Sequence, residues 1–301
     1  MRSFGWPSPA KLNLFLHIVG RRTDGYHLLQ TVFQFIELTD KINFSILESG
    51  TIKRSSYSPF IDENDDLVIK AAKKIKEISG SRLGVDISVE KNIPIGGGLG
   101  GGSSNAATTL VALNELWQAG LSTEELANIG LSLGADTPFF IYGSTSWAEG
   151  VGEKLDSIEL DECIYLVIYP SCNISTKSVF EAIDLTRNTP RITIRDFHEG
   201  NVKNDCESHV RNHYINVAEA LDWLDGYAPS KLTGTGACLF ARFSDEKKAN
   251  EVKNKLPEKW QGFVVKGINK SPLLERLKDE KKIKEPRSSE FAKEKDYYHG
   301  V

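Results

Sequence analysis

The stretch PIGGGLGGGSS at residues 94–104 decides the fold of this 301-residue chain. It lies between alternating apolar residues at 85–89, which predict a strand, and residues 103–117, whose apolar side chains recur at helical spacing. Glycines let successive backbone N–H groups approach a phosphate, and the helix behind them adds its positive N-terminal end. The order strand, glycine loop, helix therefore predicts a phosphate-binding loop rather than a flexible linker.

Two well-known phosphate loops can be tested against this stretch. The motif G-x-x-x-x-G-K-[ST] is absent because no lysine follows the glycines. Gly96, Gly98 and Gly101 satisfy the dinucleotide motif G-x-G-x-x-G, but a glycine run matches that motif by chance. A dinucleotide fold also needs an acidic residue about 20 positions further on, and the nearest candidate, Glu115, lies inside the predicted helix. The sequence excludes a P-loop and supports a dinucleotide-dependent oxidoreductase only weakly.

Towards the N-terminus, residues 10–19 alternate in the manner of a strand. Apolar residues at positions 12, 14, 16 and 18 share one face, which predicts a half-buried strand. Lys11 and Asn13 project from the other face, about 7 Å apart at the usual rise of a strand. Asp24 and Gly25 then predict a turn, so we expect the first 50 residues to be mainly β.

The rest of the chain predicts a mixture of helices and strands. Ser122 and Glu125 form a capping-box pattern at the start of one helix. An apolar run at 163–169 predicts a buried strand, and a domain boundary is expected near 150–160. Apolar periodicity and helix-end signals predict helices at 65–79, 122–133, 216–224 and 245–256.

The composition is that of a globular protein, with 40% hydrophobic and 26% charged residues. The length is about twice a usual domain of roughly 150 residues, so we expect two domains. Lys+Arg 37 against Asp+Glu 41 gives a net charge of -4, without a basic block that would bind nucleic acid. No apolar run approaches the roughly 18 residues that span a bilayer, and residues 1–22 do not resemble a signal peptide.

The charges near the C-terminus and the spacing of the cysteines give two further predictions. From residue 278 to the end the chain is dense in Lys and Glu, which predicts a solvated tail. The cysteines lie far apart with no C-x-x-C pair, which predicts reduced thiols in a cytoplasmic enzyme; they are Cys163, Cys172, Cys206 and Cys238.

Three motifs together resemble those of the GHMP kinases, the superfamily of galactokinase, homoserine kinase, mevalonate kinase and phosphomevalonate kinase. PIGGGLGGGSS resembles their central ATP-binding motif. PAKLNLFLHIVGRRTDGYHLLQTVFQ and LTGTGACLFARF resemble the first and third motifs of one branch, which phosphorylates 4-diphosphocytidyl-2-C-methyl-D-erythritol in non-mevalonate isoprenoid biosynthesis. With GADTPFF between the second and third motifs, the resemblance covers roughly residues 5–275.

The resemblance implies an α+β fold of two domains with the active site between them. Residues 1–158 would form a ribosomal-protein-S5-like, nucleotide-binding N-terminal domain. Residues 159–277 would form a ferredoxin-like C-terminal domain, and residues 278–301 a charged, disordered tail.

The catalytic residues implied by the resemblance are Lys11 and Asp136. Taken alone, Asp136 reads as a carboxylate that caps a turn after the helix stop at Gly134. The resemblance implies instead that Asp136 accepts the proton of the attacking hydroxyl, with Lys11 beside it. Lys11 would keep Asp136 ionised and stabilise charge on the transferred phosphoryl group. Without the resemblance, Lys11 would be interpreted as a charge that protects a strand edge from aggregation.

The resemblance also implies a site for the cytidine end of the substrate. By themselves, Tyr26 and His27 after the turn are more often packing residues than ligands. The resemblance implies that Tyr26 and Phe180 stack on the two faces of the cytosine, that His27 hydrogen-bonds the base, and that Asn13 contacts the substrate. The residues TKSV at 176–179 depart from the proline-bearing pattern of the family.

A kinase needs Mg²⁺ to bridge the phosphates, which Ser103 or Ser104 could assist, but no acidic ligand can be identified. His209 and His213 stand four apart and could share a helical face as metal ligands, but no acidic residue at a ligand spacing completes the set, so an exposed helix is favoured.

The ATP site implied by the resemblance is the glycine stretch: Pro94, Ile95, Gly96, Gly97, Gly98, Leu99, Gly100, Gly101, Gly102, Ser103 and Ser104.

These features predict an ATP-dependent kinase that phosphorylates the 2-hydroxyl of 4-diphosphocytidyl-2-C-methyl-D-erythritol. The expected partners are ATP, Mg²⁺ and this cytidine diphosphate substrate, with no nucleic acid, membrane or protein partner. Another GHMP kinase of the homoserine or mevalonate type is the nearest alternative. A dinucleotide-dependent oxidoreductase and a non-catalytic, S5-like RNA-binding module are the alternatives from other classes.

Overall fold

The computed structural model describes residues 1–55, 65–200 and 202–284. The elements up to residue 158 are β1 (Arg2–Arg21), β2 (His27–Leu47), β3 (Ile52–Arg54), α1 (Leu67–Ser79), β4 (Gly84–Glu90), α2 (Gly101–Leu116), α3 (Thr123–Leu131), α4 (Thr137–Tyr142), β5 (Ser146–Gly150) and β6 (Lys154–Ser157). Those that follow are β7 (Ile164–Tyr169), α5 (Thr176–Glu181), α6 (Ile194–His198), α7 (Glu207–His213), α8 (Ile215–Asp225), β8 (Ser230–Leu232), β9 (Leu239–Phe243), α9 (Glu246–Lys253), β10 (Gln261–Ile268) and α10 (Pro272–Lys284).

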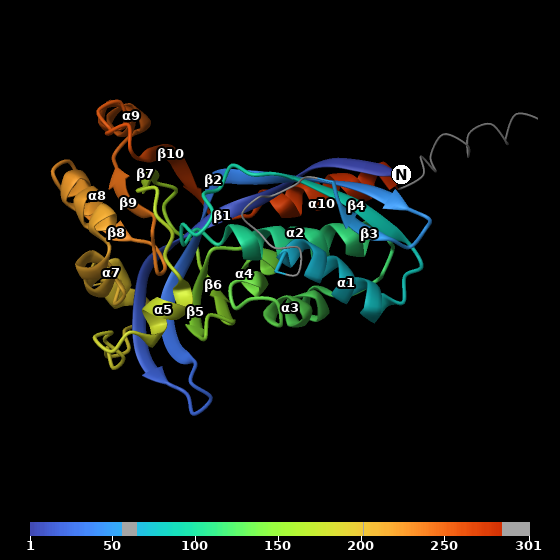
Figure 1. Ribbon diagram of the computed structural model, residues 1–301, viewed down its shortest axis with the longest axis horizontal. Coiled ribbons are helices and arrows are strands. Elements are labelled where there is room, and N and C mark those ends of the chain that lie inside the picture. The colour runs from blue at the N-terminus through green and yellow to red at the C-terminus, as the bar shows by residue number, and fades with distance from the viewer. Residues whose placement is uncertain (56–64, 201, 285–301) are drawn as a thin grey trace, which may run out of the picture.

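The described strands form one sheet in the order β3-β4-β2-β10-β7-β9-β8; β1 pairs along the other edge of β2, β5 pairs with residues 29–33 of β2, and β6 pairs with β5. The contact between β2 and β10 is short: Gly267 lies opposite Ile36 and Ile268 opposite Phe35. Helices α1 to α4 lie in one half of the molecule, and α7, α8 and α9 lie with β7 to β10 in the other (Figure 1). The long β1–β2 hairpin runs between the two halves.

The predicted elements are largely confirmed. Asp66 caps α1 by accepting a hydrogen bond from the backbone N–H of Val68, and the Ser122/Glu125 capping box at α3 is present. The predicted strand at 163–169 overlaps β7. All four cysteines are free thiols, as expected. Within the described ranges, no helix has the length and apolar character needed to cross a membrane.

The N-terminal strand is buried on both faces, so the prediction of a half-buried strand is wrong. Lys11 and Asn13 are only 3% and 2% exposed. The glycine loop and α4 cover their face, since a Cβ on Gly100 would lie 2.8 Å from Phe140 and 3.1 Å from Cε of Lys11. The strict alternation also ends at a bulge between Asn13 and Leu16.

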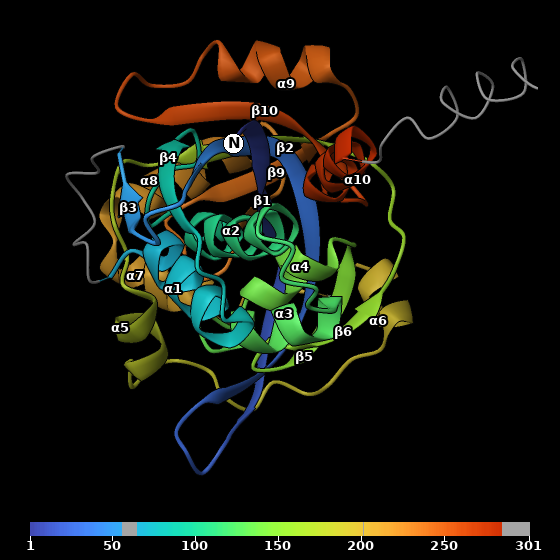
Figure 2. The same cartoon turned by 90° about the vertical axis from the view of Figure 1, so that its right-hand side faces the viewer.

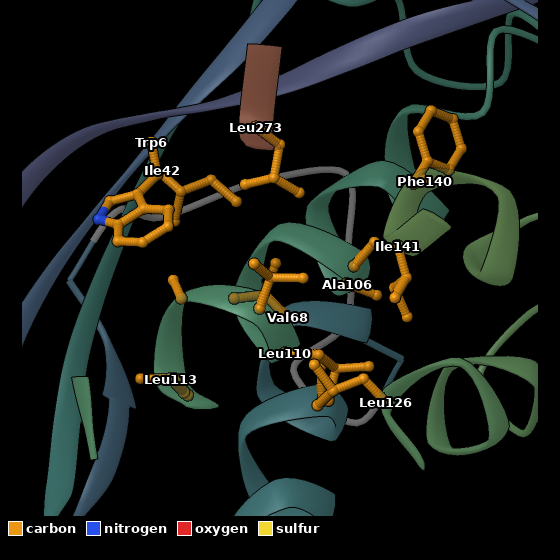
Figure 3. Packing of buried hydrophobic residues seen from close by; sticks show 14 of the residues in the cluster. Trp6, Ile42, Val68, Ala106, Leu110, Leu113, Leu126, Phe140, Ile141 and Leu273 are labelled. Carbon is orange, nitrogen blue, oxygen red and sulfur yellow. The ribbon is translucent and has the colours of Figure 1, made fainter. Parts of the chain in front are cut away.

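The hydrophobic core is divided between the two halves of the molecule. In the first cluster α2 packs amid α1, α3, α4 and α10 (Figure 2), and residues such as Val68, Leu110 and Leu273 meet there (Figure 3). A second cluster joins β7, β9, α7 and α8, and it also includes Leu16 and Ile18 of β1. The division at residue 158 stays a prediction, because each core draws on both sides of it.

The start of the predicted tail is ordered. Residues 278–284 belong to α10, so the prediction of disorder from residue 278 is wrong for them, and residues 285–301 lie outside the described residues. Glu280 is buried and accepts hydrogen bonds from Arg276 (2.6 Å) and from the hydroxyl of Ser3 (2.9 Å). These bonds attach α10 to β1.

We expect Leu273→Ala to lower the free energy of unfolding by about 2–5 kcal/mol, because the side chain is fully buried in the first core cluster. Ile283→Ala on the same helix is the matched control, since Ile283 is 75% exposed, and should change this free energy by less than about 0.5 kcal/mol. Urea denaturation measures both. Equal effects would contradict the packing of α10 in this core.

Candidate functional site

A cavity of about 480 Å³ lies between the glycine loop, β1, α5 and the loop before β9. Most of the predicted site residues line it, while Ser104, Tyr26 and His27 are not among its walls. The predicted residues that do line it are Lys11, Asn13, Pro94, Ile95, Gly96, Gly97, Gly98, Leu99, Gly100, Gly101, Gly102, Ser103, Asp136 and Phe180. The cavity therefore gathers residues that are far apart in the sequence.

The glycine loop has a backbone conformation that other residues rarely adopt. Gly96, Gly98 and Gly100 have φ angles of 71°, 73° and 73°. A Cβ on Gly98 would lie 2.5 Å from the carbonyl oxygen of Thr233 and 2.8 Å from that of Gly236. Glycine is thus required at position 98 both for its φ angle and for the close approach of a second loop.

Backbone hydrogen bonds join the three sequence motifs. The N–H of Lys11, in the first motif, donates to the carbonyl oxygen of Leu99 at 3.0 Å. The N–H of Cys238, in the third motif, donates to the carbonyl oxygen of Gly97 at 3.0 Å. The glycine loop is therefore held from both sides, and its position relative to Lys11 is determined by the backbone.

The N-terminus of α2 opens into the cavity. Its N-cap is Gly100, which provides no side-chain cap, and Gly101, Gly102 and Ser103 of its first turn line the cavity. Uncapped N–H groups at a helix N-terminus favour an anion. Ser104 is instead fully buried, and its hydroxyl accepts a hydrogen bond from Ser8 at 2.8 Å, so Ser103 is the serine that can meet a ligand.

Lys11 and Asp136 form an ion pair in the wall of the cavity. The distance from Nζ of Lys11 to Oδ2 of Asp136 is 3.3 Å, and the two side chains are 4% and 30% exposed. Lys11 also donates to Oδ1 of Asn13 and lies 5.0 Å from the centre of the Phe33 ring. Asp136 occupies the N-cap position of α4, but its carboxylate makes no capping hydrogen bond. The capping alternative for Asp136 is thereby excluded.

The predicted residues of the cytidine site are only partly brought together. The ring of Phe180 stacks on His27, with ring centres 5.1 Å apart and planes 22° apart. Tyr26 is 64% exposed in the β1–β2 turn. Only Phe180 of these three residues lines the cavity.

Arg187 holds this cluster together, although the sequence analysis did not identify it. Its Nε donates to Nε2 of His27 at 3.0 Å, and the rest of its guanidinium donates to the carbonyl oxygens of Phe180, Ala182 and Leu185. Burial, and secondly the positive charge of Arg187, lower the pKa of His27. His27 is therefore held as a neutral ring whose proton is on Nδ1. No local sequence signal connects residues that are 160 positions apart.

A second charged pair anchors the start of the glycine loop. Asp40 is fully buried and accepts hydrogen bonds from the backbone N–H groups of Asn92 (2.7 Å) and Ile93 (2.9 Å). It also accepts from the side chains of Lys91 and Asn105. Lys91 lines the cavity as well, so Asp40 couples a cavity cation to the backbone that leads into the glycine loop.

Comparison with protein families places this fold and cavity in a known class. The model described as GHMP kinases N terminal domain matches residues 66–144, and the one described as GHMP kinases C terminal matches residues 186–262. The mevalonate kinase of Methanococcus jannaschii shares the fold, with a TM-score of 0.63 and 19% identity over 89% of this chain and 98% of that one. The fold and the cavity are those of the ATP-dependent small-molecule kinases of the GHMP type.

Closer relatives narrow the class. Proteins named 4-diphosphocytidyl-2-C-methyl-D-erythritol kinase from Alkalilimnicola ehrlichii and Shewanella pealeana are each 52% identical to the chain, over 91% of it and over 94% and 97% of their own lengths. A crystal structure of 4-(cytidine 5'-diphospho)-2C-methyl-D-erythritol kinase matches with a TM-score of 0.77 and 29% identity, over 89% of this chain and 100% of that one. The chain belongs to this family of GHMP kinases.

We expect Asp40→Asn to lower the free energy of unfolding by about 3 kcal/mol, because it leaves the Lys91 ammonium beside a buried amide. The matched control is Lys53→Met, which removes the 3.1 Å ion pair with Asp86 from a lysine that is 57% exposed and should cost less than about 1 kcal/mol. Urea denaturation of the two variants checks the difference. Similar costs would show that Asp40 does not anchor the loop.

Proposed function

We propose that this chain transfers the γ-phosphoryl group of ATP to the 2-hydroxyl of 4-diphosphocytidyl-2-C-methyl-D-erythritol. The observation that carries the proposal is the Lys11–Asp136 ion pair of 3.3 Å beside the glycine loop, in one cavity. Such a pair places a proton acceptor and a cation where a phosphoryl group would leave the loop. The names of relatives that are 52% identical support the choice of substrate.

In this proposal the phosphates of ATP lie on the glycine loop. The N–H groups of Gly101, Gly102 and Ser103 at the start of α2 face the cavity without a side-chain cap. They would donate to phosphate oxygens, and the helix dipole would favour the negative charge. Because these donors are fixed in the backbone, no reorganisation is needed when charge develops during the transfer.

Asp136 would accept the proton of the attacking hydroxyl, and Lys11 would stabilise the transferred group. The Asp136 carboxylate is 30% exposed and so remains accessible from the cavity, whereas Lys11 is held by Asn13 and by the carboxylate itself. Asn13 is in turn fixed by a hydrogen bond from its Nδ2 to the Thr31 hydroxyl at 3.0 Å. General-base or orienting help of this kind accelerates a reaction about 10²- to 10⁴-fold.

Mg²⁺, when bound, would offset the negative charge that develops on the phosphate oxygens during the transfer. Asp136 is the one carboxylate among the described residues that line the cavity, and the hydroxyl of Ser103 also reaches it. A set with so few protein ligands fits an ion that binds largely through phosphates and retains several waters. We therefore assign Ser103 and Asp136 as the residues that would lie closest to the ion.

The cytosine would stack on Phe180, whose ring would move off His27 as the base enters, and Tyr26 of the β1–β2 turn would cover its other face. With Nε2 of His27 occupied by Arg187, the Nδ1–H group is left as a donor. N3 of cytosine accepts a hydrogen bond, whereas N3 of uracil carries a proton. In this proposal Arg187 is a positioning residue, because it sets the tautomer with which His27 distinguishes the two bases.

We expect Asp136→Asn and Lys11→Met each to lower kcat about 100-fold or more while the affinity for ATP stays near normal. The effects should not add in the double variant, because the two residues act as a unit. Steady-state kinetics and ATP titration test this, with Lys41→Met on the exposed side of β2 as the control. A variant that keeps more than about a tenth of the wild-type kcat would remove that residue from the mechanism.

We expect Phe180→Ala to weaken substrate binding roughly 5- to 150-fold, because it removes a stacking face worth about 1–3 kcal/mol. His27→Ala and Arg187→Met should each narrow the kcat/KM ratio between the cytidine substrate and its uridine analogue, because the ordered donor is lost. Tyr227→Ala, at an exposed aromatic residue after α8, is the control. An unchanged ratio in His27→Ala would contradict the role assigned to His27.

A further inference from the structure

Two histidines and a carboxylate meet on the surface of α7, outside the cavity. His209 and His213 lie four residues apart on α7, and Asp184 comes from the segment after α5. One ligand atom of each of the three side chains lies within 4.8 Å of the other two. The sequence analysis found the histidine pair and no acidic residue at a ligand spacing. Asp184 supplies an acidic partner from 25 residues away in the chain, where no local spacing indicates it.

The Nδ1 atoms of the two rings face the carboxylate of Asp184. Nδ1 of His209 lies 2.7 Å from Oδ1 of Asp184, and Nδ1 of His213 lies 2.8 Å from the carbonyl oxygen of His209. Carboxylate and carbonyl oxygens only accept, so both Nδ1 atoms donate in this structure, and Nδ1 of His213 also lies 4.0 Å from Oδ2 of Asp184. A metal ion bound among the three side chains would replace the two Nδ1 protons, because a histidine that binds a metal releases the proton of the ligand nitrogen. The ligand atoms are thus Nδ1 of each ring and a carboxylate oxygen of Asp184.

The backbone on both sides of this cluster is fixed by the core. Leu185 follows Asp184, Val210 follows His209, and both are buried in the second core cluster. The ligand side chains nevertheless reach solvent, since Asp184 is 48% and His213 54% exposed. The two rings are stacked with centres 4.2 Å apart, and both present Nδ1 to the same carboxylate. A metal ion can reach them without opening the fold.

We propose that Asp184, His209 and His213 form a binding site for Zn²⁺ or a similar divalent transition metal. Imidazole nitrogen suits zinc, copper and nickel, and two histidines with one carboxylate are a zinc ligand set that leaves a fourth position open. Zinc–ligand bonds of about 2.0–2.2 Å place ligand atoms about 3.4 Å apart. Small rotations of the exposed Asp184 and His213 side chains can bring their atoms to this distance from the less exposed His209. Mg²⁺ prefers oxygen ligands, so this site is chemically distinct from the phosphate-bound ion.

A metal ion here would connect α7 to a segment on which the cavity depends. Asp184 lies four residues after Phe180, which lines the cavity, and three residues before Arg187, which holds His27. A bound ion would therefore restrain the segment after α5 against α7. Binding of the metal does not depend on the proposed kinase reaction, so the two can be tested separately.

Isothermal titration calorimetry with zinc chloride tests the proposal on the full chain, prepared without a polyhistidine tag and treated with a chelator beforehand. We expect the wild type to bind one equivalent of zinc. His213→Ala and His209→Ala should each abolish this binding, and Asp184→Asn should weaken it at least about 10-fold, because it removes the carboxylate ligand. His198→Ala is the matched control, because this exposed histidine of α6 lies outside the cluster, and it should bind zinc as the wild type does.

Circular dichroism establishes that each variant is folded, and His213→Ala is the safest of them because its side chain is more than half exposed. Zinc should also raise the Tm of the wild type but not of His213→Ala, because a ligand that binds only the folded state stabilises it. The proposal is overturned if the wild type does not bind zinc at millimolar concentration. It is equally overturned if the His209→Ala, His213→Ala double variant binds zinc as tightly as the wild type.

Discussion

The backbone pairing of the glycine loop with two other loops is the constraint on which the site depends. Leu99 is bonded to Lys11 of β1, and Gly97 to Cys238 before β9. These bonds bring together three segments that are far apart in the chain, around residues 11, 97–99 and 238. Glycine at position 98 permits the close approach of the loop before β9. The backbone donors at the start of α2 take their position from this pairing, because α2 begins directly at the end of the loop.

Two lysine–aspartate pairs, Lys91–Asp40 and Lys11–Asp136, lie near this loop and have different roles. The Asp40 carboxylate is fully buried and binds the backbone ahead of the loop, so its pair with Lys91 is structural. The Asp136 carboxylate is partly exposed and makes no capping bond, so its pair with Lys11 remains available to a ligand. Burial of an ionised group is costly unless it is paired, which explains why the buried Lys11 and the buried Asp40 each have a partner of opposite charge. The difference in exposure between the two carboxylates therefore distinguishes the pair that anchors the loop from the pair that can take part in the reaction.

Local patterns in the sequence were enough to predict the glycine loop, the main helices and the strand at 163–169, because periodicity and capping are short-range properties. The family motifs likewise led to Lys11 and Asp136, which the structure places 3.3 Å apart. What the sequence could not reveal were contacts between distant segments that follow no local pattern. Arg187 on His27 and Asp184 on His209 are of this kind. The burial of both faces of β1 also depends on segments that come much later in the chain.

The most direct test of the central claim is ³¹P NMR of the wild-type protein incubated with ATP, Mg²⁺ and 4-diphosphocytidyl-2-C-methyl-D-erythritol. The account predicts that ADP and one new phosphate monoester, on the 2-hydroxyl of the substrate, appear in equal amounts. Parallel reactions with mevalonate and homoserine should yield no phosphorylated product at a comparable rate. Hydrolysis of ATP without a new monoester, or faster phosphorylation of mevalonate or homoserine, would contradict the account.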